Sequence, residues 1–228
     1  MEIVININGL RKEFKKIAVI DGISLQLKSG DIFGLVGVNG SGKTTLIKIL
    51  ATIIKPTVGT AYILNYDISR EPQKVRRFIG YLPYSYKPYY DLKVREYIAF
   101  YAGAYKIPRS DRKDIINDIL ELTNLIATKD QYIKDLSDGM IQRLGIARTL
   151  IHDPMVLLFD EPLIGLDPKS RAEIMEIIKE LGNMGKTLIV SSGIISDIMT
   201  ICNKVGIMKD GKIIISGDID EINFSDYL

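Results

Sequence analysis

The chain has 228 residues, 46% of them hydrophobic and 25% charged, which is typical of a globular protein with one substantial core. Its 30 basic and 28 acidic residues leave a net charge of +2, which gives no reason to expect nucleic acid as a partner. One cysteine excludes an internal disulfide framework, and no apolar run approaches the roughly 18–20 residues that span a bilayer. We therefore expect a cytoplasmic protein that reaches any membrane through a partner.

The N-terminal part of the chain is predicted to form antiparallel strands. Apolar and polar residues alternate between residues 2 and 27, which predicts two or three strands, at 4–8, 18–20 and 23–27. This alternation does not resemble a signal peptide. The apolar segment 32–36 is then a candidate buried strand.

A glycine-rich segment follows this strand and precedes a helical pattern. Its form, G-x-x-x-x-G-K-[ST], lets backbone N–H groups surround an anion while the next helix directs its positive end to the same place. Lys43 is expected to reach the β- and γ-phosphates, and the Thr44 hydroxyl to ligate Mg²⁺. The alternative, a glycine-rich turn with a surface lysine, leaves the complete pattern unexplained, so we predict a nucleoside triphosphate site. The predicted site residues are Gly37, Val38, Asn39, Gly40, Ser41, Gly42, Lys43, Thr44 and Thr45.

The middle of the chain changes from strands to helices. After a turn, the sequence predicts strands at 60–64 and 78–82 and a short helix at 73–77. From residue 84 to about residue 150, apolar residues recur at three- and four-residue spacing, which predicts a helical insert. Its expected helices are 92–104, 112–125 and 140–150.

Two carboxylates follow the continuous apolar run 155–159, which is typical of a central parallel strand. Ligands of open parallel sheets bind at the carboxyl ends of the strands. Asp160 is expected to hold Mg²⁺ through its water shell, and Glu161 to orient and polarise an attacking water. An acidic pair of this kind is common by chance, but the segment 162–168 that follows makes chance a poor explanation.

The end of the chain repeats the alternation of helix and strand. It predicts a helix at 168–181, a strand at 187–190 and two strands, 205–208 and 213–215, around the turn Asp210-Gly211. The predicted fold is α/β: a P-loop NTPase core with a mixed, mostly parallel sheet, an N-terminal antiparallel β subdomain and a helical insert subdomain.

A third motif lies upstream of the acidic pair, where residues 136–143 look like the L-S-G-G-Q signature. With three motifs in this order and spacing, the chain resembles the nucleotide-binding subunits of ATP-binding cassette (ABC) transporters over nearly its whole length. It looks most like the stand-alone ATPase subunits of exporter-like systems, on softer evidence from the segments 79–83, 92–97 and 145–148.

The resemblance implies a single ABC ATP-binding domain over residues 1–228, with an ATPase core of 1–83 and 151–228 and a helical subdomain of about 84–150. It implies a Mg²⁺-dependent ATPase, with ATP and Mg²⁺ as cofactors, that dimerises head-to-tail around ATP. The dimer would drive a separate transmembrane permease and lie peripherally on the cytoplasmic face of the cell membrane.

The resemblance also assigns roles to further residues. Phe14 lies where an aromatic ring stacks on adenine, although from spacing alone it is equally a half-buried strand residue. Ser137 and Gly139 of the signature are expected to face the γ-phosphate bound to the partner subunit. Asp167 matches an aspartate that communicates between the two sites of the dimer; before Pro168 it is also a helix cap, and both roles can hold.

Three positions depart from the family. Tyr84 replaces a glutamine that touches Mg²⁺ and water, and a rigid phenol cannot copy a flexible amide. Gly193 replaces a histidine that donates to the γ-phosphate. Asp138 replaces a glycine of the signature, and its charge either weakens the attraction for the partner's phosphate or stabilises its own helix. The only histidine, His152, aligns with no catalytic role and is interpreted as a surface loop residue.

Three functions stay open. Glu161 favours a working ATPase, which we place first, whereas Tyr84 and Gly193 favour a catalytically weak nucleotide clamp paired with another subunit. A soluble ABC ATPase without a membrane partner is the third.

The tyrosine-rich stretch 83–90 lies where family members dock the short helices of the membrane subunit, or it packs on its own domain. The sequence leaves open the substrate, the direction of transport, a homo- or heterodimer, and the preferred base.

Overall fold

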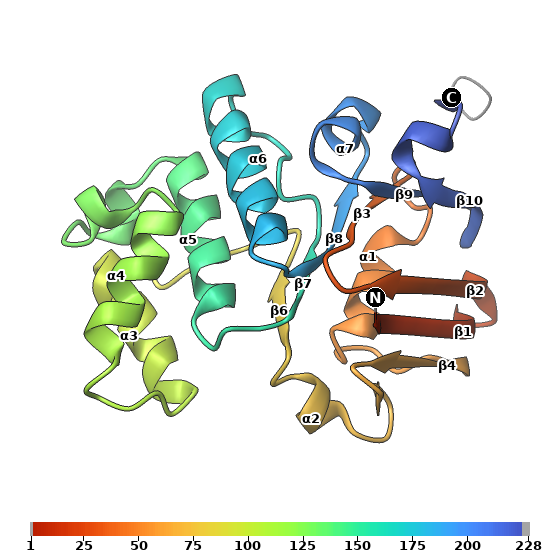
Figure 1. Cartoon of the computed structure of the whole chain (residues 1–228), viewed down its shortest axis with the longest axis horizontal. Coiled ribbons are helices and arrows are strands. Elements are labelled where there is room, and N and C mark those ends of the chain that lie inside the picture. Colours follow the sequence, from red (N-terminus) through yellow and green to blue (C-terminus); the bar gives the residue numbers. More distant parts are fainter. Residues whose placement is uncertain (1, 225–228) are drawn as a thin grey trace.

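Two β-sheets organise the molecule, which a computed structural model describes for residues 2–224 (Figure 1). The smaller sheet is antiparallel and has the strand order β2-β1-β4-β5. Its strands are β1 (Ile3–Phe14), β2 (Ile17–Lys28), β4 (Val58–Ile63) and β5 (Tyr66–Asp67). The predicted antiparallel part is therefore present at the N-terminus.

The sequence predicts two or three strands between residues 2 and 27, and the structure has two, β1 and β2. The segments 18–20 and 23–27 belong to one strand, β2, because the chain continues through Gly22 at a φ of 74°. The register between β1 and β2 shifts at this point, as in a β-bulge. The bulge interrupts the alternation of apolar and polar residues, which is why the sequence pattern divides there.

The larger sheet is mixed and mostly parallel, as predicted. Its strand order is β10-β9-β3-β8-β7-β6, and only the edge pair β9–β10 is antiparallel. Every residue of the central strands β3, β7 and β8 is buried, as expected for strands covered on both faces. The strands are β3 (Ile32–Val36), β6 (Ile79–Leu82), β7 (Val156–Phe159), β8 (Thr187–Ser192), β9 (Lys204–Lys209) and β10 (Lys212–Asp218).

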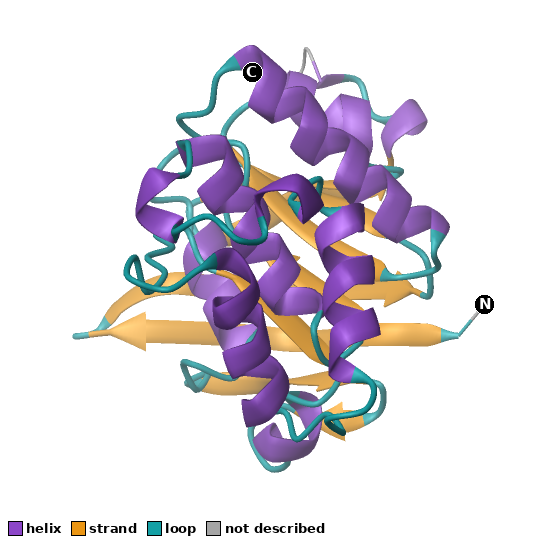
Figure 2. Ribbon diagram, turned by 90° about the vertical axis from the view of Figure 1, so that its left-hand side faces the viewer, coloured by secondary structure: helices purple, strands orange, loops and turns teal. Residues whose placement is uncertain are grey.

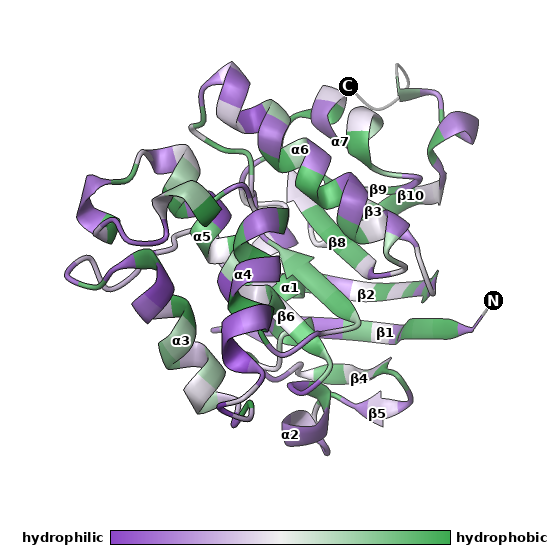
Figure 3. Cartoon of the chain, turned by 60° about the vertical axis from the view of Figure 1, so that its left-hand side comes forward, coloured by the Kyte–Doolittle hydropathy of each residue, from purple (hydrophilic) through white to green (hydrophobic). Residues whose placement is uncertain are grey.

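Helices cover both faces of the larger sheet. Helix α1 (Lys43–Leu50) shares a hydrophobic cluster with β1 and β2, so it lies between the two sheets. The other face is covered by a layer of helices, which lies in front of the strands in Figure 2. In Figure 3, the outer turns of α4 are hydrophilic. Its helices are α3 (Val94–Ala104), α4 (Arg112–Leu122), α5 (Asp138–Leu150), α6 (Pro168–Asn183) and α7 (Ile195–Ile201), and the short α2 is Pro72–Val75.

Some boundaries differ from the predicted ones. Helix α4 ends three residues early because Asn124 adopts a left-handed φ of 54°, which helical residues do not. Helix α5 begins two residues early because Ser137 caps it. Strand β5 and helix α7 are not among the predicted elements. Within residues 2–224, no helix has the length and apolar character needed to cross a membrane.

Candidate functional site

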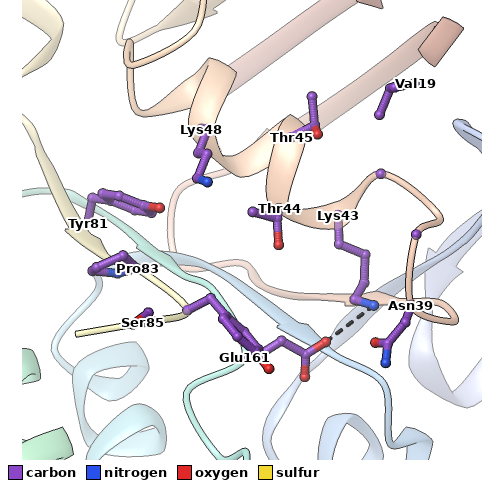
Figure 4. Close-up of a pocket in the computed structure, with 13 residues that line it drawn as sticks. Val19, Asn39, Lys43, Thr44, Thr45, Lys48, Tyr81, Pro83, Ser85 and Glu161 are labelled. Carbon is purple, nitrogen blue, oxygen red and sulfur yellow. Dashed lines mark ion pairs between the residues drawn. The ribbon is translucent and has the colours of Figure 1, made fainter. Parts of the chain in front are cut away.

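The motif residues meet at the carboxyl edge of the larger sheet. Strands β3, β7 and β8 are parallel neighbours, with Val36 paired to Ser192 and Phe159 paired to Val190. The loops that leave them therefore start side by side. A cavity of about 470 Å³ opens at this edge between the glycine-rich loop and the end of β6 (Figure 4). It is lined by Val19, Asn39, Gly40, Gly42, Lys43, Thr44, Thr45, Lys48, Tyr81, Pro83, Tyr84, Ser85 and Glu161.

The glycine-rich loop has the backbone that its sequence predicts. Gly40 and Gly42 have φ values of 85° and 110°, a region that favours glycine. A Cβ at Gly37 would lie 2.3 Å from the Met208 carbonyl oxygen, so the loop is held close to β9. Helix α1 begins at Lys43 without a side-chain cap, which leaves its positive end available to an anion.

The Lys43 side chain is folded across this loop. It is only 5% exposed, and its ammonium donates to the carbonyl oxygens of Gly37 at 2.6 Å and Val38 at 3.3 Å. It also forms an ion pair with Glu161 Oε1 at 3.2 Å, the dashed line in Figure 4. A buried cation at a helix N-terminus is the arrangement that recognises phosphate oxygens.

Asp160 is fully buried beside Thr44. The Thr44 hydroxyl and the Ser191 hydroxyl each donate to Asp160 Oδ1 at 3.0 Å. The second oxygen, Oδ2, is buried and has no hydrogen-bond partner within residues 2–224. Burial raises the pKa of the Asp160 carboxyl above its ordinary value, partly offset by the two hydroxyls. A carboxylate oxygen without a partner next to a threonine hydroxyl fits a hard cation such as Mg²⁺.

Two protein oxygens do not complete such a coordination shell. The described part of the chain has no group of three or more His, Cys, Asp and Glu side chains that could hold a metal ion. Mg²⁺ commonly binds through one or two protein ligands and takes the others from phosphate and water. The pair Thr44 and Asp160 therefore fits a metal that arrives with a nucleotide.

Glu161 lies between Lys43 and the end of β8. Its backbone has a φ of 51°, which is uncommon for a residue other than glycine and costs about 1–3 kcal/mol. Its N–H donates to the Ser191 hydroxyl at 2.9 Å, and its Oε2 accepts the Gly193 N–H at 3.2 Å. These contacts direct the carboxylate toward the glycine-rich loop.

Eight predicted site residues do not line the cavity. Four of them, Gly37, Val38, Ser41 and Asp160, belong to the glycine-rich loop and the acidic pair described above, and the other four lie elsewhere. Phe14 lies at the end of β1, is 43% exposed and packs under the Lys12 ammonium at 4.9 Å from the ring centre. Val19, from β2, reaches the cavity instead. Ser137, Gly139 and Asp167 lie at the starts of α5 and α6. Their predicted roles toward nucleotide stay predictions.

The starts of α5 and α6 are packed against each other and satisfied locally. The Ser137 hydroxyl accepts the Met140 N–H at 3.3 Å, and Asp167 accepts the N–H groups of Lys169 and Ser170 at 3.0 and 3.1 Å. Hydrogen bonds from Ser170 and Lys169 lower the pKa of Asp167. A Cβ at Gly139 would lie 2.2 Å from the Ser170 hydroxyl oxygen. Asp167 is therefore a helix cap, and Gly139 is required for close helix packing.

The three departures have different surroundings. Tyr84 lines the cavity but is 54% exposed. Asp138 is exposed in the first turn of α5. At Gly193, a Cβ would meet only Glu161 Oε1 and the Gly37 carbonyl oxygen, both at 4.0 Å, so the position has room for a side chain.

His152 is not the surface loop residue that the sequence suggested. It is half-buried, its ring stacks on Tyr105 with the centroids 4.0 Å apart, and its Nε2 lies 3.0 Å from the Ile79 carbonyl oxygen. Burial lowers the pKa of the His152 imidazole. The aspartate and proline after it indicated a loop, but the end of α5 packs this loop onto β6.

The tyrosine-rich stretch 83–90 packs in part on its own domain. The Tyr86 ring packs on α5 below Arg148, and its hydroxyl donates to the Tyr97 hydroxyl at 2.8 Å. Tyr86 therefore contacts its own domain. Tyr89 and Tyr90 are exposed, and the Tyr89 ring lies 6.0 Å from the rings of Tyr97 and Phe100, so the docking role of the stretch stays a prediction.

Sequence reasoning missed four polar residues of the site: Lys48, Tyr81, Ser85 and Ser191. They lie on or after elements adjacent to the glycine-rich loop or the acidic pair. Strand order brings Ser191 beside Asp160, and strand order could not be predicted from the sequence.

Comparison with known proteins supports the same motifs. Residues 20–164 match the family model described as ABC transporter. An uncharacterized ABC transporter ATP-binding protein of Nostoc sp. is 35% identical over 96% of this chain and 68% of its own length. The linearmycin resistance ATP-binding protein LnrL of Bacillus subtilis is 32% identical over 92% of this chain and 67% of its own length. The methionine import ATP-binding protein MetN of Geobacillus kaustophilus is 33% identical, and this chain spans 61% of its length.

Solved structures show the same architecture. CbiO1 of Clostridium perfringens, described as part of an ABC transporter complex, has a TM-score of 0.88 and 29% identity over 96% of this chain and 89% of its own. A dimeric ATP-binding cassette in a post-hydrolysis state, bound to ADP and Pi, has a TM-score of 0.84 and 26% identity over 94% of this chain and 98% of its own.

Proposed function

The chain belongs to the ABC transporter family, among its ATP-binding proteins, and we propose that it hydrolyses ATP with Mg²⁺ to drive a separate membrane subunit. The observation that carries this proposal is the contact between the phosphate loop and the acidic pair. Lys43 meets Glu161 at 3.2 Å, and Thr44 meets Asp160 at 3.0 Å. Each group proposed to bind phosphate or metal in the loop thus contacts a carboxylate of the acidic pair, which is proposed to hold the metal or to polarise the attacking water.

Each of these groups has a role that its surroundings support. Lys43 binds the β- and γ-phosphates after exchanging the loop carbonyls and Glu161 for phosphate oxygens. Thr44 and Asp160 would hold Mg²⁺, which would neutralise phosphate charge. Glu161 polarises the attacking water as a general base, held in place by the Gly193 N–H.

The signature residues act on a second copy or a related subunit. Ser137, Gly139 and Asp167 do not line the cavity of their own chain, which supports the head-to-tail arrangement that the family implies. A solved relative is described as a dimeric cassette. Phe14, exposed at a hairpin end, is available to stack on a base when the nucleotide is bound.

A transmembrane permease is the proposed third component, and it would hold the chain on the cytoplasmic face of the membrane. The relatives are named for methionine import and for linearmycin resistance, so their names do not agree on cargo or direction. Affinity purification from membranes should recover a multi-spanning protein. Recovery of soluble partners alone would support a soluble ABC ATPase instead.

Hydrolysis is tested with the purified chain. Replacing Glu161 by Gln should lower Mg²⁺-dependent phosphate release by about 10²-fold or more, with ATP binding retained, because the amide cannot accept a proton. Glu176→Gln, an exposed change on α6, is the matched control. Equal rates for Glu161→Gln and the unchanged chain would exclude Glu161 as the base.

A catalytically weak nucleotide clamp is the second candidate, favoured by the missing side chain at Gly193. A Cβ at Gly193 meets no atom closer than 4.0 Å, and a cavity of about 310 Å³ is lined by Gly193 and Glu161, so Gly193→His should raise turnover by about tenfold or more by adding a donor. Gly193→Ala adds a Cβ without a donor and should leave the rate unchanged. Tight ATP binding without turnover in the unchanged chain would establish the clamp, and an unchanged rate in Gly193→His would mean that another group fills this role.

A further inference from the structure

Three buried polar atoms at the phosphate site make no hydrogen bond within residues 2–224, and besides Ser41 Oγ in the glycine-rich loop two of them lie on the strand side of the site. One is Asp160 Oδ2, described above. The other is the Tyr81 hydroxyl, which is also buried and makes no hydrogen bond within residues 2–224, although Tyr81 lines the cavity. Burying a hydroxyl without a partner is unfavourable, so such a group in a ligand cavity indicates that the ligand supplies the partner.

The strand register directs Tyr81 toward the metal ligands. Tyr81 on β6 is paired with Leu158 on the parallel strand β7. Alternate residues of a strand share a face, so Leu158 and Asp160 face the same side as Tyr81. That side is covered by α1, which carries Thr44 and Lys48. Figure 4 shows the Tyr81 ring directed into the cavity from β6, on the side of these two residues.

The charge and anchoring of Tyr81 agree with this placement. Burial raises the pKa of Tyr81 to about 12, and the Asp160 charge contributes in the same direction, so the phenol stays protonated at neutral pH. The Tyr81 carbonyl oxygen accepts a hydrogen bond from Arg148 Nη2 at 2.9 Å, which fixes this end of β6. The hydroxyl is therefore a protonated group that can donate a hydrogen bond, on a strand whose end is anchored.

Tyr84 contrasts with Tyr81 although both line the cavity. Tyr84 occupies the position of the expected glutamine, yet it is 54% exposed on a loop, and its hydroxyl makes no hydrogen bond within the described part of the chain. An exposed phenol gains little from one more polar contact, whereas a buried one without a partner gains much.

We propose that the Tyr81 hydroxyl binds the hydrated Mg²⁺–phosphate group of the nucleotide beside Asp160, and so makes the polar contact that the tyrosine at position 84 does not. This inference rests on the proposed function, because it concerns the same nucleotide. It assigns a metal-dependent role to a strand residue, whereas Tyr84 has no such role.

The test compares Tyr81→Phe with the matched control Tyr84→Phe, using a fluorescent ATP analogue with Mg²⁺ and with EDTA. In Tyr81→Phe, affinity with Mg²⁺ should fall about fivefold, as for one lost hydrogen bond, and affinity in EDTA should not change. Tyr84→Phe should match the unchanged chain in both solutions. Equal Mg²⁺ dependence in Tyr81→Phe and the unchanged chain, or equal weakening in EDTA, would overturn the proposal.

Thermal unfolding gives a second readout that does not depend on activity. Without nucleotide, Tyr81→Phe should be as stable as the unchanged chain or more stable, because it removes a buried hydroxyl without a partner. Its rise in Tm with Mg²⁺ and nucleotide should be smaller. A lower Tm without nucleotide and an unchanged rise with it would assign Tyr81 to packing. If the unchanged chain binds no nucleotide, the proposed function fails; if it binds and Tyr81→Phe behaves identically, only this inference fails.

Discussion

The phosphate-loop half of the site and the signature half are built in different ways. In the first, Lys43, Thr44, Asp160 and Glu161 come from separate segments and contact one another at 3.0–3.2 Å. In the second, at the starts of α5 and α6, the polar groups are satisfied within their own helices. The first half is thus assembled by contacts within this chain, whereas the role of the second half toward a nucleotide on another subunit is a proposal. Substitutions in the two halves should therefore have different consequences.

The largest effect that we expect here comes from comparing one substitution in the phosphate-loop half with one in the signature half. Lys43→Ala removes the buried cation of the phosphate loop and should weaken ATP binding by about 10–100-fold, the loss of a charge-assisted hydrogen bond. Ser137→Ala should leave nucleotide affinity of the single chain unchanged and reduce ATP-dependent association. Titration with a fluorescent nucleotide measures the first quantity, and light scattering with and without ATP measures the second. Weakened nucleotide affinity in the Ser137→Ala monomer would mean that the signature half also binds the nucleotide of its own chain, contrary to this prediction.

The two halves also differ in how far sequence reasoning reached. The pattern of residues 37–44 predicts the local backbone conformation and therefore the phosphate site. Glycines at positive φ and the start of a helix are local properties of the sequence. The acidic pair could be placed because strand ends in a parallel sheet coincide. Tyr81 and Ser191 could not be assigned to the site from the sequence. Their proximity to Asp160 depends on strand order and register, which are set by packing.

The fold, too, could be predicted from the sequence only where its features are local. Continuous apolar runs predicted the buried strands β3 and β7 well. The bulge at Gly22 divided the pattern of one strand, β2, into two segments. The half-burial of His152 was missed because nothing in its sequence neighbourhood reveals the Tyr105 ring. The division into a core of 1–83 and 151–228 and a helical part of 84–150 stays a prediction.

The next effect concerns charge in the signature half. Asp138 is exposed at a helix start, where its carboxylate opposes an approaching phosphate. Asp138→Asn should tighten ATP-dependent association by about tenfold, equivalent to about 1.4 kcal/mol, at low salt and by less at high salt. Asp135→Asn, an exposed change shortly before the signature, is the control. Association that does not respond to salt or to Asp138→Asn would mean that this carboxylate points away from the phosphate.

A smaller effect tests how the signature half is packed. Gly139→Ala places a Cβ 2.2 Å from the Ser170 hydroxyl oxygen, and the resulting overpacking should cost about 1–3 kcal/mol of unfolding free energy. This exceeds the gain of about 1 kcal/mol that alanine brings to a helix. Ser170→Gly in the same chain should recover most of the loss. In α3, Gly103→Ala has room and should stabilise, so denaturant unfolding of the three variants decides whether packing or helix propensity dominates.

The smallest effect concerns the far end of the helix that carries the signature. His152 follows α5 and holds it to β6, with Nε2–H donating to the Ile79 carbonyl oxygen and Nδ1 buried without a partner among residues 2–224. Burial lowers its pKa below the ordinary value of 6.5, so the unfolded chain binds a proton more readily than the folded one. The stability that His152 contributes is present above pH 6.5 and is lost as the pH falls through its folded-state pKa. His152→Phe keeps the ring on Tyr105 and should lose this part of the pH dependence, by about 1.4 kcal/mol for each unit of pKa difference. Denaturant unfolding between pH 8 and pH 5 measures it, and identical pH profiles in both chains would mean that the end of α5 is not anchored by a neutral imidazole.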